Sequence, residues 1–589
     1  MNNVSAKILK ILYKYPYYTQ RELSEELSCS LGTINKNIKI LKENNFLSQD
    51  NQITNVTKKV IKRNKPLNAI ILAAGTGLRM TPINKNTSKG FIEIHGKTII
   101  VNIIEMLKEK GVEEIYIVVG YMKEQYEHLI DKYGVHLIIN NRYMETNNVY
   151  SLFLARNYIQ NSYIIPCDIW FDKNPFHDIE LNSWYLFDSK QKVFTNYFVH
   201  KNHTVTLNKK SVNSSKPLSI AYLNYDDSIK VKNQFNKLDE SYFTRKHFYW
   251  EDIVIDKCNI NIYCQNIRGN SKEINTFNDL RDIDPKSNSL KSEIIQIILN
   301  SLNIDIYDIK QISLSKKGMT NRSFLFETSK AKYIMRIPGE GTDQLINRYD
   351  EGEVYKKINP LSICDEVIYF NKDNGYKLTR FINDSRVCNP MNTHDLEICM
   401  SFLKKFHNSN IEVNHHFDLY EKIEFYEKLR KGKSLYLDYE ATKENVLKLK
   451  KIIDKLPKVW TLTHIDAVPD NFLIYYESNE EKIKLIDWEY AAMQDAHVDI
   501  AMFCIYAMYD KEHIDQLIDI YFEYKCQDII RLKIYCYIAT CGLLWSNWCE
   551  YKHQLGVEFG EYSLSQYRYA KEYYSYALRF MEVKNICIK

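Results

Sequence analysis

A glycine-rich turn near residue 75 carries residue types suited to binding phosphate. In LNAIILAAGTGLRMTP, an apolar run leads directly into Ala74, Gly75 and Gly77, and Arg79 follows. If the apolar run is a strand, the glycine amides can wrap around a triphosphate and Arg79 supplies a fixed cation. The G-x-G spacing alone is a weak signal, because glycine-rich turns commonly follow strands.

An aspartate ends a second apolar run, SYIIPCDIWF, and could hold a metal ion. Mg²⁺ is bound by one or two carboxylates together with phosphate oxygens, so Asp168 at a strand end is chemically sufficient. The alternative is that Asp168 only caps the strand.

Two acidic segments in the last third of the chain carry groups suited to phosphoryl transfer. HIDAVPDN has the HxDxxxxN spacing of kinase catalytic loops, with His464, Asp466 and Asn471, and IDWEY follows an apolar strand with Asp487 and Glu489. This resemblance implies that Asp466 accepts the substrate hydroxyl proton, whereas Asn471 and Asp487 hold Mg²⁺ and Glu489 shares it. Either segment alone could arise by chance, but both at this separation are a strong signal.

The pattern around the glycine turn continues with Pro82, Lys89 and HGKTII. Together these segments resemble nucleotidyltransferases that join a nucleoside triphosphate to a phosphorylated metabolite, over residues 67–281. The resemblance implies that Lys89 holds the α-phosphate and the incoming phosphate, and that Arg79 holds the leaving pyrophosphate.

The chain departs from that family at two positions. Lys97 stands in HGKTII where the family usually has G-x-P, and KEINTFNDL has Asn275 where a second metal-binding aspartate is usual. Asn275 still offers an oxygen, and a weaker or water-mediated metal contact is the alternative.

The C-terminal part resembles choline kinases and aminoglycoside phosphotransferases over about residues 300–575. GMTNRSF resembles their nucleotide loop, which implies that Asn321 binds nucleotide. Arg336 in YIMRIPG stands where the phosphate-contacting cation is expected, and Glu351 in INRYDEGEVY is its expected ion-pair partner. The sequences of these three segments are most similar to those of bacterial choline kinases.

Aromatic residues suggest the substrate of both parts. NRYMETNNVYSLFLA and FYWEDIV resemble segments of bacterial phosphocholine cytidylyltransferases. A trimethylammonium group is attracted to aromatic faces and carboxylates, which the second segment supplies in four consecutive residues: Tyr249, Trp250, Glu251 and Asp252. GLLWSNWCEYKH places Trp545 and Trp548 on one helix face, where choline kinases have a similar pair. For FYWEDIV, the alternative is an edge strand with one buried tryptophan. For GLLWSNWCEYKH, the alternative is a pair of core tryptophans in a helical bundle.

These segments lie in three predicted domains of a multidomain α/β and α+β protein. Alternating strands and helices over 66–285 predict a Rossmann-like nucleotidyltransferase with a mostly parallel sheet. A β-rich section and then a helical region over 290–589 predict a bilobal kinase-like domain. KRNKP (62–66) and DPKSNS (284–289) are the predicted linkers.

Residues 1–62 predict a third domain, a winged helix-turn-helix. Apolar residues at helical spacing indicate three short helices, with Thr19 and Glu22 as a capping box, and residues 46–62 predict a β-wing followed by basic residues. Thr33, Asn35, Lys36 and Lys39 would point outward from the third helix, toward a DNA major groove. Residues 1–65 contain 12 Lys and Arg against 5 Asp and Glu, which favours DNA as a partner. Dimerisation, or contact with the enzyme body, is the alternative role.

Composition limits the remaining classes. The 13 cysteines form no CxxC pair, which argues against structural zinc and against a complete disulfide framework. Neither a signal-peptide core nor a spanning run of roughly 20 apolar residues is apparent, so we expect a cytoplasmic protein without membrane insertion.

Together the resemblances imply a bifunctional enzyme. The kinase would convert choline and ATP to phosphocholine, and the cytidylyltransferase would convert phosphocholine and CTP to CDP-choline, both with Mg²⁺. The same chemistry on ethanolamine, aminoethylphosphonate or a sugar, and a ligand-sensing regulator, are the alternatives. Oligomerisation stays open.

Overall fold

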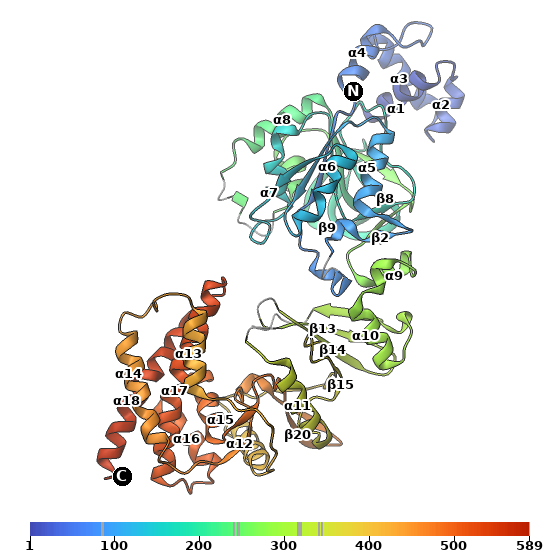
Figure 1. Ribbon diagram of the computed structural model, residues 1–589. Coiled ribbons are helices and arrows are strands. Elements are labelled where there is room, and N and C mark those ends of the chain that lie inside the picture. Colours follow the sequence, from blue (N-terminus) through green and yellow to red (C-terminus); the bar gives the residue numbers. More distant parts are fainter. Residues whose placement is uncertain are drawn as a thin grey trace. The chain divides into compact units, whose positions relative to one another are not determined.

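The computed structural model describes residues 1–83, 87–239, 242–243, 248–314, 321–339, 342 and 345–587. The chain forms two compact units, residues 1–300 and 301–589, and each is described by itself (Figure 1).

The first unit begins with a small helical domain. Its helices are α1 (Asn3–Lys14), α2 (Gln20–Glu26), α3 (Leu31–Glu43) and α4 (Asn55–Arg63). The Thr19–Glu22 capping box of α2 is confirmed. The expected wing is reduced to one bridge between Leu47 and Ile53, because Thr54 caps the start of α4 and the basic residues continue as a helix. On α3, Asn35, Lys36 and Lys39 are exposed as predicted, and Thr33 is half-buried.

This helical domain shares its core with the following domain. Leu181 is buried among Ile8, Leu9 and Ile34, and Lys10 forms an ion pair with the fully buried Glu180. The predicted linker at 62–66 is also anchored, since the Asn64 carbonyl accepts a hydrogen bond from the Tyr222 hydroxyl at 2.6 Å.

A seven-stranded sheet forms the centre of the second domain, in the order β10-β8-β9-β6-β1-β4-β5. Its strands are β1 (Asn68–Ala73), β4 (Glu114–Val119), β5 (His136–Ile139), β6 (Ser162–Pro166), β8 (Trp184–Val199), β9 (Val205–Leu223) and β10 (Tyr263–Ile267). The pairings β6–β1, β1–β4, β4–β5 and β8–β10 are parallel, whereas β9 runs antiparallel to β6 and β8. The mostly parallel sheet is therefore confirmed, with a long antiparallel hairpin that the sequence did not predict.

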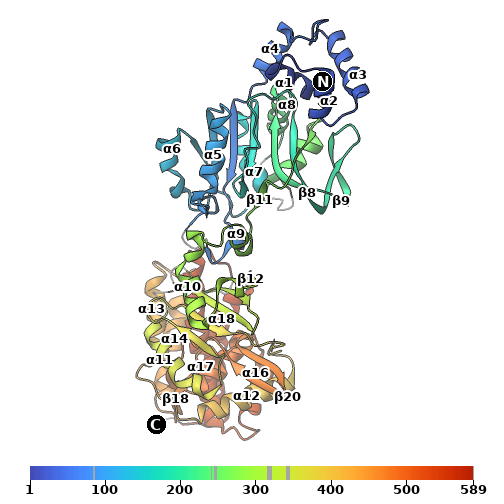
Figure 2. The same cartoon turned by 90° about the vertical axis from the view of Figure 1, so that its right-hand side faces the viewer.

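Helices cover this sheet and place the site residues at its edge. Figure 2 shows α5 (Ile99–Glu109) and α6 (His128–Tyr133) on one side of the sheet and α8 (Tyr225–Phe235) on the other. The short strands β7 (Ile169–Phe171) and β11 (Ser271–Glu273) pair with each other, which brings the segments around residues 168 and 275 together. The predicted linker at 284–289 is held by the β2–β3 hairpin (Glu93–Ile94, Lys97–Thr98): the His95 amide donates to Asp284, and the Ser287 hydroxyl donates to the Glu93 carbonyl.

The second unit begins with a five-stranded antiparallel sheet in the order β12-β13-β14-β16-β15. These strands are β12 (Gln311–Leu314), β13 (Asn321–Glu327), β14 (Lys332–Pro338), β15 (Val367–Phe370) and β16 (Lys377–Arg380), and α11 (Arg348–Ile358) lies between β14 and β15 in sequence.

A larger helical part follows, as predicted. It contains α12 (Thr393–His407), α13 (Leu419–Leu429), α14 (Tyr439–Ile453), α15 (His497–Tyr506), α16 (Lys511–Tyr521), α17 (Asp528–Gln554) and α18 (Glu561–Val583). The hairpin β19 (Phe472–Glu477) and β20 (Glu480–Leu485) separates the two acidic segments. Among the described helices, only α17 is long and apolar enough to cross a membrane, and 83% of its apolar window is buried inside the fold.

Candidate active sites

The glycine turn borders a cavity of about 240 Å³ in the first unit. Ala74, Gly75 and Gly77 line it with Lys89, Asp168 and part of the segment from residue 140 to 151. Gly77 has φ of +61°, a left-handed conformation that glycine adopts without strain. Gly120 at the end of β4 also needs to be glycine, because a Cβ there would lie 2.8 Å from the Ala74 carbonyl oxygen.

Lys89 connects the two predicted metal ligands. Its ammonium lies 2.8 Å from Asp168 Oδ2 and 2.7 Å from Asn275 Oδ1. The Asn275 amide donates to Glu273 at 2.6 Å, which orients the Asn275 oxygen toward Lys89. The arrangement offers one cation and two hard oxygen donors beside the cavity. Arg79 is exposed in the 3₁₀ turn Leu78–Met80.

The two segments that suggested phosphocholine meet in space. The Trp250 amide donates at 3.1 Å to Asn148 Oδ1, and Asn148 lines the cavity. Trp250 is fully buried and packs against Tyr185, so its faces contact protein rather than solvent, whereas Tyr249 is half exposed. The segment is helical from Trp250 to Lys257 rather than an edge strand.

The carboxylates of this segment have contrasting surroundings. Glu251 is buried, and burial raises its pKa to about 7; its Oε2 has no hydrogen-bond partner among the described residues. Asp252 is half-buried and accepts from the Tyr249 amide at 2.7 Å. A buried carboxylate with a free oxygen suits a cationic ligand that cannot donate hydrogen bonds.

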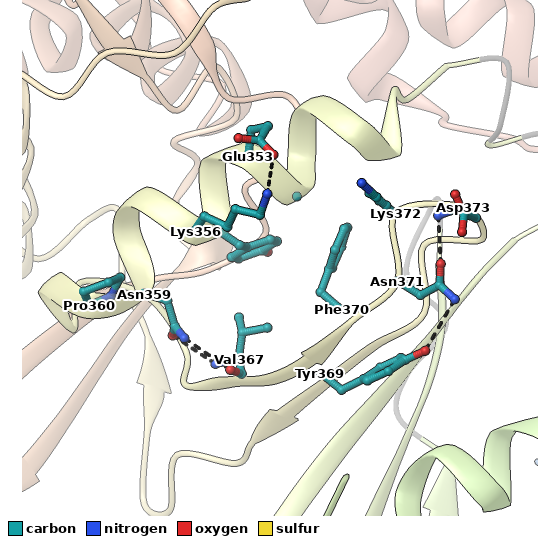
Figure 3. A pocket seen from close by; sticks show the side chains of 12 residues that line it. Glu353, Lys356, Asn359, Pro360, Val367, Tyr369, Phe370, Asn371, Lys372 and Asp373 are labelled. Carbon is teal, nitrogen blue, oxygen red and sulfur yellow. Dashed lines mark hydrogen bonds and ion pairs between the residues drawn. The ribbon is translucent and has the colours of Figure 1, made fainter. Parts of the chain in front are cut away.

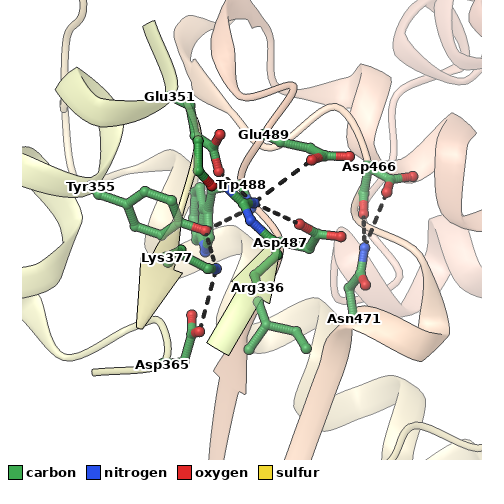
Figure 4. A network of polar contacts seen from close by, with 12 residues as sticks. Arg336, Glu351, Tyr355, Asp365, Lys377, Asp466, Asn471, Asp487, Trp488 and Glu489 are labelled. Atoms are coloured by element: carbon green, nitrogen blue, oxygen red, sulfur yellow. Dashed lines mark hydrogen bonds and ion pairs between the residues drawn. The ribbon is translucent and has the colours of Figure 1, made fainter. Parts of the chain in front are cut away.

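In the second unit, the buried guanidinium of Arg336 lies in a network of acids, of which Asp487 is 33% exposed (Figure 4). Its guanidinium is 2.6 Å from Glu351, as predicted, and 3.7 Å from both Asp487 and Glu489. Arg348, which the sequence did not single out, lies 2.7 Å from Glu351 and 3.3 Å from Glu489. Glu351 therefore bridges two arginines on the strand and helix that precede the catalytic segments.

Asp466 and Asn471 face each other across the predicted catalytic loop. The Asn471 amide donates to the Asp466 backbone oxygen at 2.9 Å and to its carboxylate at 3.2 Å. The Ile486 amide donates to the Asn471 carbonyl at 3.0 Å, so Asp487 begins next to this loop. Asp487 itself has φ of +66°, an uncommon left-handed conformation of the kind that gathers at functional sites.

Burial and mutual repulsion raise the pKa values of two of these acids. Burial, together with the charges of Asp487 and Glu489, raises the pKa of Asp466 to about 8. Burial and Asp487 raise the pKa of Glu489 to about 7. A cation bound among these oxygens would relieve the repulsion.

His464 is buried and links the loop to the segment before Asp487. Burial lowers its pKa to about 4, and its Nε2 lies 3.0 Å from the Ile486 carbonyl oxygen. Asp499, which the sequence did not single out, accepts from the His464 and Ile465 amides at 3.0 and 2.7 Å. The available signal was an acid inside the apolar helix HVDIAMFCIY.

The tryptophan pair lies on α17 as predicted, and both side chains are buried. Trp545 and Trp548 pack edge to face with ring centroids 5.4 Å apart. The Trp545 ring also contacts the ring of Tyr490, with ring centroids 5.7 Å apart. Tyr490 directly follows Glu489 in sequence. One tryptophan thus reaches the neighbourhood of the acids, while the other packs against Phe559.

Asn321 begins β13, but its side chain and residues 315–320 of the expected nucleotide loop lie outside the described residues.

Comparisons with known proteins divide the chain in the same order. Family models match residues 1–48 (winged helix-turn-helix DNA-binding), 69–178 (MobA-like NTP transferase domain) and 312–563 (choline/ethanolamine kinase). The choline-phosphate cytidylyltransferase of Streptococcus pneumoniae is 32% identical over 222 residues, which are 37% of this chain and 97% of that protein. The chain belongs to the choline-phosphate cytidylyltransferase family.

The C-terminal part has relatives of its own. Protein LicA of Haemophilus influenzae is 27% identical over 262 residues, 42% of this chain and 96% of that protein. The crystal structure of choline kinase LicA from Streptococcus pneumoniae covers 48% of this chain and 100% of its own, at 26% identity and a TM-score of 0.43. The family models and the sequence relatives of each part identify a cytidylyltransferase domain and a kinase domain, as the resemblances implied.

The oxygen donors of both domains suit Mg²⁺. Among the described residues, no group of three or more His, Cys, Asp or Glu side chains could enclose a metal by itself. Mg²⁺ commonly binds one or two protein oxygens and takes the rest from phosphates and water. Asp168 with Asn275, and Asn471 with Asp487 and Glu489, fit that pattern.

Proposed function

We propose that the chain makes CDP-choline from choline in two consecutive steps. The kinase domain phosphorylates choline with ATP, and the cytidylyltransferase domain joins phosphocholine to CTP and releases pyrophosphate. One observation carries the proposal: the charged groups that each reaction requires are present and gathered in both domains, in a chain similar to enzymes of both steps.

In the kinase step, Asp466 orients the choline hydroxyl and accepts its proton as the hydroxyl oxygen attacks the γ-phosphorus of ATP. ADP leaves, and Arg336, held in place by Glu351, neutralises phosphate charge. The raised pKa of Asp466 suits a proton acceptor near neutral pH. Asn471, Asp487 and Glu489 would hold Mg²⁺, which supplies positive charge for the transferring phosphate.

In the transferase step, a phosphocholine oxygen attacks the α-phosphorus of CTP and pyrophosphate leaves. The turn at Ala74, Gly75 and Gly77 binds the triphosphate, and Arg79 contacts the leaving group. Lys89 holds both reacting phosphates, which requires its ammonium to exchange Asp168 and Asn275 for phosphate oxygens. Asp168 and Asn275 would then hold Mg²⁺, which would supply positive charge for the triphosphate. Catalysis is then mainly positioning and charge neutralisation.

Aromatic rings and buried acids select the quaternary ammonium in both domains. In the kinase, Trp545 and Tyr490 present rings beside Glu489. In the transferase, Tyr249, Glu251 and Asp252 provide the ring and the charges, while Trp250 is buried against Tyr185. The kinase rings are buried, so a cation–π contact there is stronger than one at the half-exposed Tyr249 of the transferase.

The test is incubation of the full chain with choline, ATP, CTP and Mg²⁺, following products by mass spectrometry. CDP-choline with ADP and pyrophosphate supports the proposal. Parallel reactions with ethanolamine or aminoethylphosphonate in place of choline decide between the amines, and preferred turnover of either would replace choline as the substrate.

We also propose that the winged helix-turn-helix binds DNA in the cytoplasm. The exposed Asn35, Lys36 and Lys39 on α3 and the excess of basic residues favour this role. We further propose that the chain divides into three domains, at residues 1–62, 66–285 and 290–589. Anisotropy titration of the full chain with genomic DNA fragments at several salt concentrations tests DNA binding, because phosphate contacts make DNA affinity fall steeply with salt.

A further inference from the structure

A pocket of about 530 Å³ lies between α11 and β15 of the kinase domain (Figure 3). One wall is formed by residues 352–360 and the other by residues 367–373. β15 is the last strand of its sheet, and Asn359 closes one end by exchanging two hydrogen bonds with the Val367 backbone. Small-molecule sites commonly have volumes of about 300–1,000 Å³, so the pocket is large enough for a metabolite.

The pocket combines aromatic rings with charges of both signs. The rings of Tyr355 and Phe370 lie 5.6 Å apart in its wall. The lining also includes Glu353, Asp373, Lys356 and Lys372. Lys356 pairs with Glu353 at 2.5 Å, and Lys372 donates to the Tyr349 hydroxyl at 2.6 Å, so a ligand carrying both charges would exchange these contacts for its own. Aromatic faces and carboxylates attract a quaternary ammonium, and lysines attract a phosphate. The lining therefore suits a zwitterion that carries both groups.

Tyr355 connects this pocket to the phosphate-transfer site. Its ring lines the pocket, while its hydroxyl accepts hydrogen bonds from Lys377 at 2.7 Å and from the Trp488 amide at 3.4 Å (Figure 4). Trp488 stands between Asp487 and Glu489 in sequence. Glu351, the partner of Arg336, precedes Tyr355 by one turn of α11. A change in the pocket thus reaches the acids and the phosphate-binding arginine through one helix.

We propose that this pocket binds a phosphorylated quaternary amine and thereby inhibits the kinase. The inference rests on the proposed function, because phosphocholine is the kinase product with this chemistry. A ligand wedged between α11 and β15 moves the helix and separates Glu351 from Arg336. Phosphocholine that the transferase has not consumed then slows its own synthesis.

The experiment measures ADP formation by the full chain with ATP, Mg²⁺ and saturating choline, without CTP, while phosphocholine is increased. We expect kcat to fall several-fold. The double variant Lys356→Glu, Lys372→Glu should keep its basal turnover, since neither side chain belongs to the catalytic network, and should need at least tenfold more phosphocholine for the same inhibition. Val367→Trp, which fills the pocket, should also lose the response.

Each other outcome has a defined consequence. Equal inhibition of both variants and the parent chain would show that phosphocholine acts at the active site, and would overturn the pocket assignment. Normal choline turnover without any response would also overturn it and leave the proposed function standing. Absence of choline turnover would overturn the proposed function and this inference together. Inhibition by phosphatidylcholine vesicles but not by phosphocholine would replace the soluble ligand with a lipid headgroup.

Discussion

The Lys89 ammonium lies 2.8 Å from the Asp168 carboxylate, although 79 residues separate them in sequence. In this pair the lysine neutralises the acid that we propose holds Mg²⁺. Under the proposed function, a triphosphate and a metal would provide new partners for both charged groups. This pairing keeps a half-buried acid and a half-buried lysine in place before substrate arrives.

Replacing Lys89 with methionine should remove cytidylyl transfer and spare the kinase. The variant loses the cation that both phosphates need, and we expect a decrease of at least 100-fold in CDP-choline formation from supplied phosphocholine, the scale of losing one preorganised charged contact. Pyrophosphate release measures the transferase, and ADP formation is the internal control. Transferase activity near that of the parent chain would contradict the role of Lys89.

Asn275→Asp should retain transferase activity and lower the Mg²⁺ concentration required for half-maximal rate. A second carboxylate beside Asp168 strengthens metal binding, because Mg²⁺ prefers charged oxygen ligands. Asp168→Ala is the matched loss-of-ligand variant and should abolish transfer. An unchanged Mg²⁺ requirement in Asn275→Asp would place Asn275 outside the metal site.

Asp466→Asn should abolish phosphocholine formation. The amide cannot accept the hydroxyl proton, and loss of a general base costs roughly 10²–10⁴-fold in rate. CDP-choline synthesis from supplied phosphocholine should remain intact, which controls for folding. Near-normal kinase turnover would remove Asp466 from the mechanism.

Trp545→Leu should raise the KM for choline by roughly 30-fold, the effect of losing one desolvated cation–π contact of about 2 kcal/mol. Trp545→Phe should retain most of the affinity. Both variants replace a buried indole that packs on Tyr490. Comparing them separates the effect of an aromatic ring on choline binding from the effect of lost side-chain volume. Choline titrations and melting temperatures are measured together. An unchanged KM with a collapsed melting temperature in Trp545→Leu would show a packing role alone.

The ion pair between Lys10 and Glu180 should make the first unit sensitive to acid. Burial opposes ionisation of Glu180, but Lys10 and His177 overcome it and lower the pKa to about 2 from an ordinary 4.5. Because the folded pKa is depressed, the contribution is fully present above about pH 4.5 and is lost as pH falls toward 2. The shift corresponds to roughly 3 kcal/mol at most.

Urea unfolding of the parent chain and of Glu180→Gln at pH 7, 4 and 3 measures this contribution. The parent chain should be more stable at pH 7, and the difference should shrink as pH falls. A difference that stays constant from pH 7 to pH 3 would show that Glu180 is not stabilised as a charge.

Local sequence determined much of this protein. The apolar run before Ala74, the strand before Asp487, the capping box at Thr19 and the tryptophan spacing on α17 all depend on neighbours a few residues away. Strand and helix periodicity and turn chemistry act at that range, so these elements and their candidate residues could be read directly.

Only the tertiary structure decided which of these residues meet. Asn275 reaches Lys89 across 186 residues because β7 and β11 pair, and Arg348 and Tyr355 join the kinase network because α11 packs between its sheet and the catalytic segments. Burial of Trp250, the anchoring of both predicted linkers and the pocket beside β15 likewise depend on packing between distant segments. Such contacts arise from the shapes of packed sheets and helices, and periodicity within one segment carries no information about the partner that another segment will present.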